Sequence, residues 1–244
     1  MMLWIAAAFI AFFVKGLCGF ANTLVFNTIL SFSGNNISIS PVELVLGYPS
    51  NIIIAWRERK NIRPAVVIPI AAMVMAGSLL GVFLLKNTDV RLVKIIFGAV
   101  VVLVGFEIFF RKASSTSADD GGNRKIITPG MLFFGILSGI LCGLYGVGAL
   151  LGAYISRVTS GSGEFKGNIC TVFVIENTFR VIMYTVTGIL TAGALLTALK
   201  LVPFMLLGLF AGIKAASLLD EKMAARLITI TLIISGAALI VTNL

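Results

Sequence analysis

The chain has 244 residues, of which 59% are hydrophobic, 12% are charged and none is histidine. A soluble domain has roughly 45 to 50% apolar and about 25% charged residues, so this composition excludes a soluble globular protein. The absence of histidine removes the usual general base and zinc ligand, and we therefore expect no enzyme and no cofactor. The net charge of +9 comes from nineteen Lys and Arg residues scattered between apolar runs, which does not indicate a nucleic-acid-binding surface.

Six apolar runs predict membrane-spanning helices. A crossing needs about twenty apolar residues, because the hydrocarbon core of a bilayer is roughly 30 Å thick. The runs cover residues 41–56, 64–85, 90–110, 165–187, 190–214 and 223–241. The first run is short, but the uncharged stretch before it can extend the helix. We therefore expect an all-α polytopic protein of a bacterial-type inner membrane.

Two further apolar segments, 2–32 and 128–157, are too long for one crossing and too short for two. A glycine-rich element interrupts each segment near its centre, at residues 15–22 and 139–148. Each half is then about a dozen residues, which reaches roughly the bilayer midplane. This pattern predicts two re-entrant helical hairpins, with two single broken helices as the alternative.

The two halves of the chain repeat one another. Five residues of the first half match five of the second at one constant offset, namely Gly77, Gly81, Asp89, Arg91 and Gly105 with Gly208, Gly212, Asp220, Lys222 and Gly236. The Cys-Gly pairs at Cys18 and Cys142 correspond as well, as do Asn51 and Asn177. We expect a first repeat over residues 1–110, a cytoplasmic linker over 111–128 and a second repeat over 129–244.

The distribution of positive charge decides between parallel and inverted repeats. Parallel repeats of four crossings place eight Lys and Arg residues on each side, which shows no bias. If each glycine-broken segment is a hairpin, each half crosses three times and the second half is inverted; thirteen positive residues then lie inside and three outside. The sequence thus predicts inverted repeats, each with one re-entrant hairpin and three transmembrane helices, and both termini outside.

These features resemble those of the TauE/SafE family of membrane proteins, which are described as exporters of sulfite or organosulfur anions. The resemblance covers nearly the whole chain and is carried by the glycine-rich run 137–148, by residues 166–177 and by 187–189. Two departures are Phe20-Ala21-Asn22, where the family often has more glycine, and the missing proline after the glycines in both halves. The resemblance implies transport of a small anion more firmly than it implies sulfite.

The two hairpin tips are the expected anion site, because inverted-repeat transporters bind substrates where half-helices meet at the midplane. A helix that restarts after a break presents unpaired N–H groups and the positive end of its dipole. The candidates are Lys15, Gly16, Cys18, Gly19, Phe20 and Asn22 at the first tip, Cys142, Gly143, Tyr145 and Gly146 at the second, and Asn51 and Asn177 within crossings. As alternatives, the glycines serve only helix packing and the cysteines are small apolar fillers.

Charged residues inside apolar runs are costly and mark functional sites. Lys15, Glu176, Arg180 and Lys200 are such residues, and their sum of +2 suits an oxyanion. Glu176 and Arg180 are four residues apart and can neutralise each other on one helix face. Lys200 either pairs with Glu176 or extends to the membrane interface.

The expected function is a secondary transporter that moves a small, sulfur-bearing anion by alternating access. A proton-coupled mechanism would need Glu43, Glu107 or Glu176, and only Glu176 is expected near the midplane; coupling to Na⁺ through backbone carbonyls remains equally open. The alternatives are a carrier or channel for another anion and a non-transporting subunit of a membrane complex. The expected partners are the substrate anion and the lipid bilayer. The oligomeric state is open, with a homodimer as one option.

Overall fold

The computed structural model describes residues 1–31, 36–87 and 161–218, together with isolated positions between 99 and 159 and between 223 and 241. Regular structure in these ranges is entirely helical, which confirms the predicted fold class for this part of the chain. The elements are α1 (Met2–Cys18), α2 (Asn22–Ser31), α3 (Asn36–Arg57), η1 (Arg59–Asn61), α4 (Pro64–Asn87), α8 (Ser162–Val186) and α9 (Ala192–Ala216). The expected linker, 111–128, lies outside the described residues, as does almost all of the expected crossings 90–110 and 223–241.

Three helices in the described ranges are long and apolar enough to cross a membrane: Pro64–Gly81 within α4, Ser162–Val186 and Ala192–Ala216. Helix α3 has 22 residues and spans about 33 Å, so it is also long enough. Its sequence is less apolar than those of α4 and α9, because it contains Ser40, Glu43, Ser50 and Asn51. These four side chains are buried inside the protein. The expected extension of this helix before residue 41 is confirmed, since α3 begins at Asn36.

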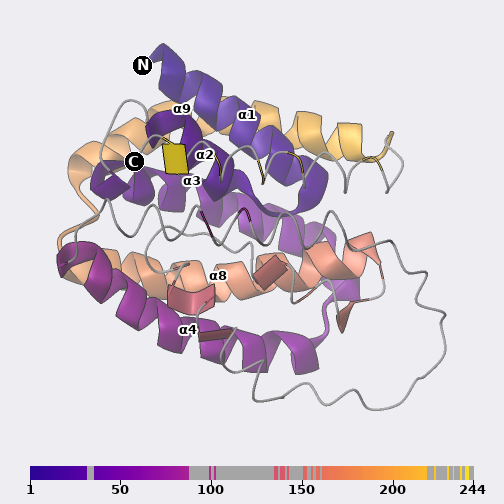
Figure 1. The fold of residues 1–244 in the computed structure, drawn as a ribbon. Helices are drawn as coiled ribbons and strands as arrows, with labels where there is room; N and C mark the ends of the chain where they lie inside the picture. The colour runs from indigo at the N-terminus through magenta and orange to yellow at the C-terminus, as the bar shows by residue number, and fades with distance from the viewer. Residues whose placement is uncertain are drawn as a thin grey trace.

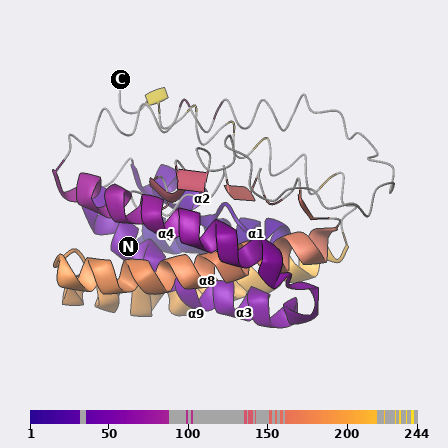
Figure 2. The same cartoon turned by 90° about the horizontal axis from the view of Figure 1, so that it is seen from below.

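The helices of the two halves interleave. Helix α1 packs along α9, α9 contacts α3, α3 packs against α8, and α8 packs against α4. Figure 1 shows α1 lying beside α9 and α4 lying beside α8, with α3 between these two pairs. The same pairing of α4 with α8 is visible from below in Figure 2. Each half therefore depends on the other for its packing.

Helices α3 and α8 run antiparallel. Near the start of α3, the Ser40 hydroxyl lies 2.9 Å from the Tyr184 hydroxyl, close to the end of α8. At the opposite end, the Asn168 side chain in the second turn of α8 accepts a hydrogen bond from the Arg63 backbone N–H at 2.8 Å, just after η1. The Arg63 side chain also forms an ion pair with Glu164 at 2.9 Å. These contacts fix the direction of one helix against the other along its whole length.

Glycines let helices from opposite halves touch through their backbones. A side-chain Cβ at Gly208 would meet the Phe9 carbonyl, and one at Gly212 would meet the Phe13 carbonyl, both in α1. From the other side, a Cβ at Gly16 would meet the α9 backbone. A similar approach joins α4 to the second glycine-rich element, where Gly77 lies against the backbone around Gly139. For Gly16 and Gly139, which belong to the glycine-rich elements, this close helix packing is the role named as the alternative to anion binding.

Candidate functional site

The first glycine-rich element interrupts the helix as the sequence predicts. Helix α1 ends at Cys18, and Gly19 takes the left-handed conformation with φ 87° while its N–H donates to the Lys15 carbonyl at 2.6 Å. Ala21 also has a positive φ, of 72°, before α2 begins at Asn22. Helices α1 and α2 contact each other, so the chain folds back at this point. We call residues 19–21 the first break.

The start of α2 holds a carboxylate of the chain itself. The Asn22 side-chain amide and the Thr23 hydroxyl both donate to Oε1 of Glu43, each at 2.6 Å. Gly47, one turn further along α3, makes this approach possible, because a Cβ there would lie 2.9 Å from the same oxygen. The N-terminus of a helix carries partial positive charge, so this position suits an anion. The described donors are the side chains of Asn22 and Thr23, and the anion that they hold is Glu43 of the chain itself, whereas the sequence predicted a substrate anion held mainly by backbone N–H groups.

Arg180 connects this arrangement to a second carboxylate. Its Nη2 lies 3.5 Å from Oε2 of Glu43, and its Nη1 lies 3.8 Å from Oε1 of Glu176. The same Nη1 donates to the Cys142 carbonyl oxygen at 3.1 Å. All three charged side chains are at least 96% buried. We call Glu43, Glu176 and Arg180 the buried charge cluster.

The buried charge cluster joins the two glycine-rich elements. Glu43 contacts the residues that follow the first break, whereas Arg180 contacts the carbonyl of Cys142 in the second element. The Ser78 hydroxyl of α4 lies 3.1 Å both from Oε1 of Glu176 and from the Gly139 carbonyl, which adds a further link to the second element. The ion pair of Glu43 with Arg180 thus connects the first break with the described part of the second glycine-rich element, where Gly139 and Cys142 are helical.

Two atoms of the buried charge cluster have no hydrogen-bond partner among the residues that the structure describes. They are Nε of Arg180, which is a donor, and Oε2 of Glu176, which is an acceptor. Oδ1 of Asn51 is unpartnered as well. Because more than about nine in ten buried polar groups in proteins are hydrogen-bonded, such atoms indicate a place where a small polar ligand or water binds.

The formal charge of the buried residues differs from the expected +2. Lys15 is 1% exposed, with its ammonium 5.8 Å from the centroid of the Phe12 ring, and Glu43 acts on it electrostatically. Lys200 is exposed on α9, so it does not pair with Glu176 and fits the alternative of a side chain at the membrane interface. Lys15 and Arg180 therefore face two buried carboxylates, and the formal charge of this region is zero.

The expectation that only Glu176 lies near the centre is wrong. We call the donors Asn22, Thr23 and Arg180 the cradle. Glu43 occupies this cradle, because α3 begins at Asn36 and Glu43 is consequently two turns inside the helix. A carboxylate within an apolar run was the available signal, but the run 41–56 begins only two residues before Glu43, and the sequence does not define how far the helix extends before residue 41. Ser78, which contacts Glu176, carried no comparable signal in the sequence.

The remaining candidates divide into buried residues and residues outside the described part of the chain. Cys18, Phe20, Cys142 and Asn177 are buried, and the Phe20 ring packs edge-on against Phe165 with centroids 5.7 Å apart. The described cysteines form no disulfide. Gly143, Tyr145 and Gly146 lie outside the described residues, so the structure does not show whether they approach the cluster.

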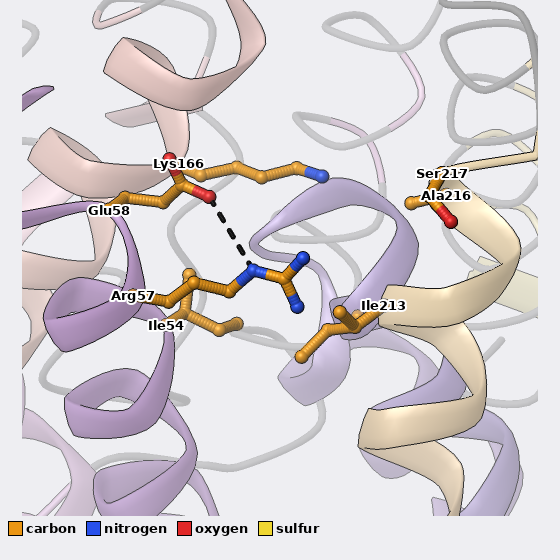
Figure 3. A pocket seen from close by; sticks show the side chains of 8 residues that line it. Ile54, Arg57, Glu58, Lys166, Ile213, Ala216 and Ser217 are labelled. Carbon is orange, nitrogen blue, oxygen red and sulfur yellow. Dashed lines mark ion pairs between the residues drawn. The ribbon is translucent and has the colours of Figure 1, made fainter.

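A basic pocket of about 160 Å³ reaches the last turn of α1. Figure 3 shows Arg57 and Lys166 extending into it, with the Arg57 Nε 4.0 Å from the Glu58 carboxylate. The pocket also contains Gly16, Ile54, Ile213, Ala216 and Ser217. Lys166 passes directly over the first break, since a Cβ on Gly19 would lie 2.8 Å from its Cγ. Two cations and one carboxylate therefore lie just outside the break, and the cradle lies just beyond it.

A family model described as the sulfite exporter TauE/SafE matches residues 4–239. The chain belongs to the TauE/SafE family. This confirms the resemblance noted in the sequence and identifies an integral membrane protein of a transporter family for sulfite and related anions. A search of curated proteins and a search of solved structures found no match. Within the described residues, no group of three or more Cys, Asp or Glu is placed to hold a metal ion.

Proposed function

We propose that this TauE/SafE protein is a secondary transporter that moves a small anion across the inner membrane by alternating access. The substrate class is a sulfur oxyanion, such as sulfite, or a small organosulfonate. The observation that carries the proposal is the cradle at the start of α2, where Asn22, Thr23 and Arg180 together hold a carboxylate in the protein interior. The same donors suit the oxygen atoms of a substrate anion.

The antiparallel course of α3 and α8 supports inverted repeats. These helices are equivalent in the internal repeat, which pairs Asn51 with Asn177, and parallel repeats would place them in the same direction. The contacts of Ser40 with Tyr184 and of Arg63 with Asn168 show opposite directions. We therefore retain both termini outside and a re-entrant hairpin in each half. A reporter fused after Leu244 that proved cytoplasmic would contradict this orientation.

The basic pocket is the proposed cytoplasmic entrance. Arg57 and Lys166 belong to the positively charged connections that the charge distribution places inside. An anion that enters between them meets Gly16 and the first break, then the ammonium of Lys15 and the cradle. Positive charge at a narrow entrance raises the local concentration of anions, which suits a binding step that precedes transport.

Anion binding to the purified protein tests this proposal. Sulfite, thiosulfate and ethanesulfonate are titrated into the detergent-solubilised protein in a calorimeter, with competition between them to rank the substrates. We expect Lys15→Met to weaken binding by about tenfold or more, because a hydrogen bond to a charged group contributes about 1.5 to 3 kcal/mol. Lys200→Met, which removes an exposed ammonium, is the matched control and should change the affinity less than about twofold.

Equal effects of the two lysine substitutions would contradict the proposed site. If a different small anion displaces all three sulfur compounds, the protein is a carrier or channel for that anion, and the same two lysine variants then locate its binding site.

A further inference from the structure

We propose that Glu43 carries the coupled proton: it is ionised when the cradle holds no substrate, and it takes up one proton when the substrate anion binds. This inference rests on the proposed function, because it concerns the same site. It names the coupling ion and the residue that binds it. The evidence is the position of the Glu43 carboxylate, which occupies the place expected for the transported anion.

Glu43 occupies the donors that an incoming anion would use. Oε1 accepts hydrogen bonds at 2.6 Å from Asn22 and from Thr23, and Oε2 faces Arg180 at 3.5 Å. A Cβ at Gly47 would lie 2.9 Å from Oε1, so the carboxylate fits closely against α3 at this position. A substrate that uses the same donors must therefore displace the Glu43 carboxylate.

Displacement without a proton would leave two anions in one buried site. An ionised Glu43 repels the incoming anion, and the low local dielectric makes such repulsion strong. One proton taken up from the surrounding solution forms an O–H bond on the Glu43 carboxylate. The resulting neutral carboxylic acid releases Arg180 for the substrate. When the substrate leaves, the proton returns to water and the ion pair with Arg180 forms again. No other bond is made or broken.

The charges around Glu43 fit this exchange. The titratable groups that face it are Lys15 of α1, Glu176, Arg180 and Tyr184 of α8, and Cys142 of the second glycine-rich element. In α2 the adjacent donors, Asn22 and Thr23, are neutral. Two cations therefore balance two carboxylates before binding. One substrate of charge −1 together with one proton leaves this balance unchanged, so the combined binding step is electroneutral.

Glu176 is in a different position. It contacts Arg180 and Ser78, but it makes no contact with the donors at the start of α2. Its carboxylate therefore holds neither Asn22 nor Thr23, the donors that Glu43 occupies, and its Oε2 atom has no hydrogen-bond partner among the described residues. Glu176 therefore stays ionised as the permanent counter-charge of Arg180, and Glu43 alone exchanges with the substrate.

Proton uptake on anion binding tests the inference. The probe is ethanesulfonate, because it stays ionised across the neutral range and every proton that moves then belongs to the protein. Purified protein in a weakly buffered solution with a pH indicator is mixed with the probe at pH 7. We expect about one proton taken up per anion bound, and an affinity that falls about tenfold per pH unit in the range where free Glu43 is ionised.

The variants separate Glu43 from the other carboxylates. Glu43→Gln, a neutral mimic of the protonated acid, should bind the probe without proton uptake and with an affinity independent of pH. Glu176→Gln should still take up a proton. Glu164→Gln, which changes a carboxylate that pairs with Arg63 away from the cradle and is not among the residues lining the basic pocket, should behave like the unmodified protein.

Three results would overturn the inference. They are binding by the unmodified protein without proton uptake, loss of proton uptake in Glu176→Gln with retention in Glu43→Gln, and binding that depends on Na⁺ with no proton taken up. The first and third need no variant, so the test stands even if Glu43→Gln fails to fold. Absence of any binding by the unmodified protein would instead refute the proposed function itself.

Discussion

Arg180 is the residue on which the buried charges depend. It faces Glu43 and Glu176 at 3.5 and 3.8 Å and donates to the Cys142 carbonyl. An arginine suits this position because its planar fork presents several donors at once, which a lysine ammonium does not. The residue therefore holds together parts of the chain that are far apart in sequence.

We expect Arg180→Ala to destabilise the protein by about 3 to 5 kcal/mol, because removal of one partner leaves buried carboxylates unpaired. The measurement is thermal unfolding of the detergent-solubilised protein. Arg59→Ala is the control, since the Arg59 guanidinium stacks on the exposed Trp56 ring at 5.1 Å and should contribute only about 1 kcal/mol. Equal melting temperatures for Arg180→Ala and the unmodified protein would contradict this role.

Among the single residues, the sequence indicated the buried cations better than the buried carboxylates. Lys15 and Arg180 interrupt apolar runs, and their burial follows directly from that pattern. The role of Glu43 depended on where α3 begins, and helix starts are poorly defined in an uncharged, proline-containing stretch. The contact of Arg180 with Glu43 joins residues 137 positions apart, which no local pattern can predict.

At the scale of elements, the first break places the cradle. Its position was predictable, because two glycines three residues apart, Gly16 and Gly19, weaken a helix within an apolar run and allow positive φ. Ala21 is less expected there, since a non-glycine residue rarely takes its φ of 72°. The structure places Asn22 and Thr23 in the first turn after this strained step, where the helix dipole favours the anion that they bind.

The contact of α1 with α9 fixes the position of this break. We expect Gly212→Ala to destabilise the protein by about 1 to 3 kcal/mol, because its Cβ would overlap the Phe13 carbonyl and push the helices apart. Gly193→Ala in the first turn of α9 is the matched control, since a Cβ there would lie 3.9 Å from its nearest neighbour, the Thr191 hydroxyl oxygen. Thermal unfolding of both variants measures the difference.

A melting temperature for Gly212→Ala equal to that of Gly193→Ala would show that the backbone contact of α1 with α9 does not hold these helices together. The sequence marked Gly208 and Gly212 only through the internal repeat, whereas their contacts with α1 depend on the packing of two distant helices.

At the scale of the whole molecule, the two halves share one buried centre. Glu43 comes from the first half, Arg180 and Glu176 from the second, and Ser78 from α4 adds the link to the second glycine-rich element. The general class of the fold followed from composition and from the length of the apolar runs. The direction of α3 against α8 and the interleaved packing required the structure, because they depend on contacts between the halves.

This arrangement connects binding with conformational change. The ion pair of Glu43 with Arg180 links the residues after the first break to the Cys142 carbonyl of the second glycine-rich element. In the proposed mechanism, a substrate that replaces Glu43 at the cradle breaks this ion pair, and we expect this change to favour the movement between the halves. Alternating access requires that dependence.

Transport by the purified protein in proteoliposomes is the decisive test of the proposed anion transport. Vesicles loaded with unlabelled anion are diluted into labelled sulfite, thiosulfate or ethanesulfonate, and exchange of the label is followed over time. We expect saturable exchange of at least one of these anions, inhibited by the others. Lys15→Met should reduce this exchange about tenfold or more, and Lys200→Met should not. No saturable exchange of any of them, with or without a proton or Na⁺ gradient, would contradict it.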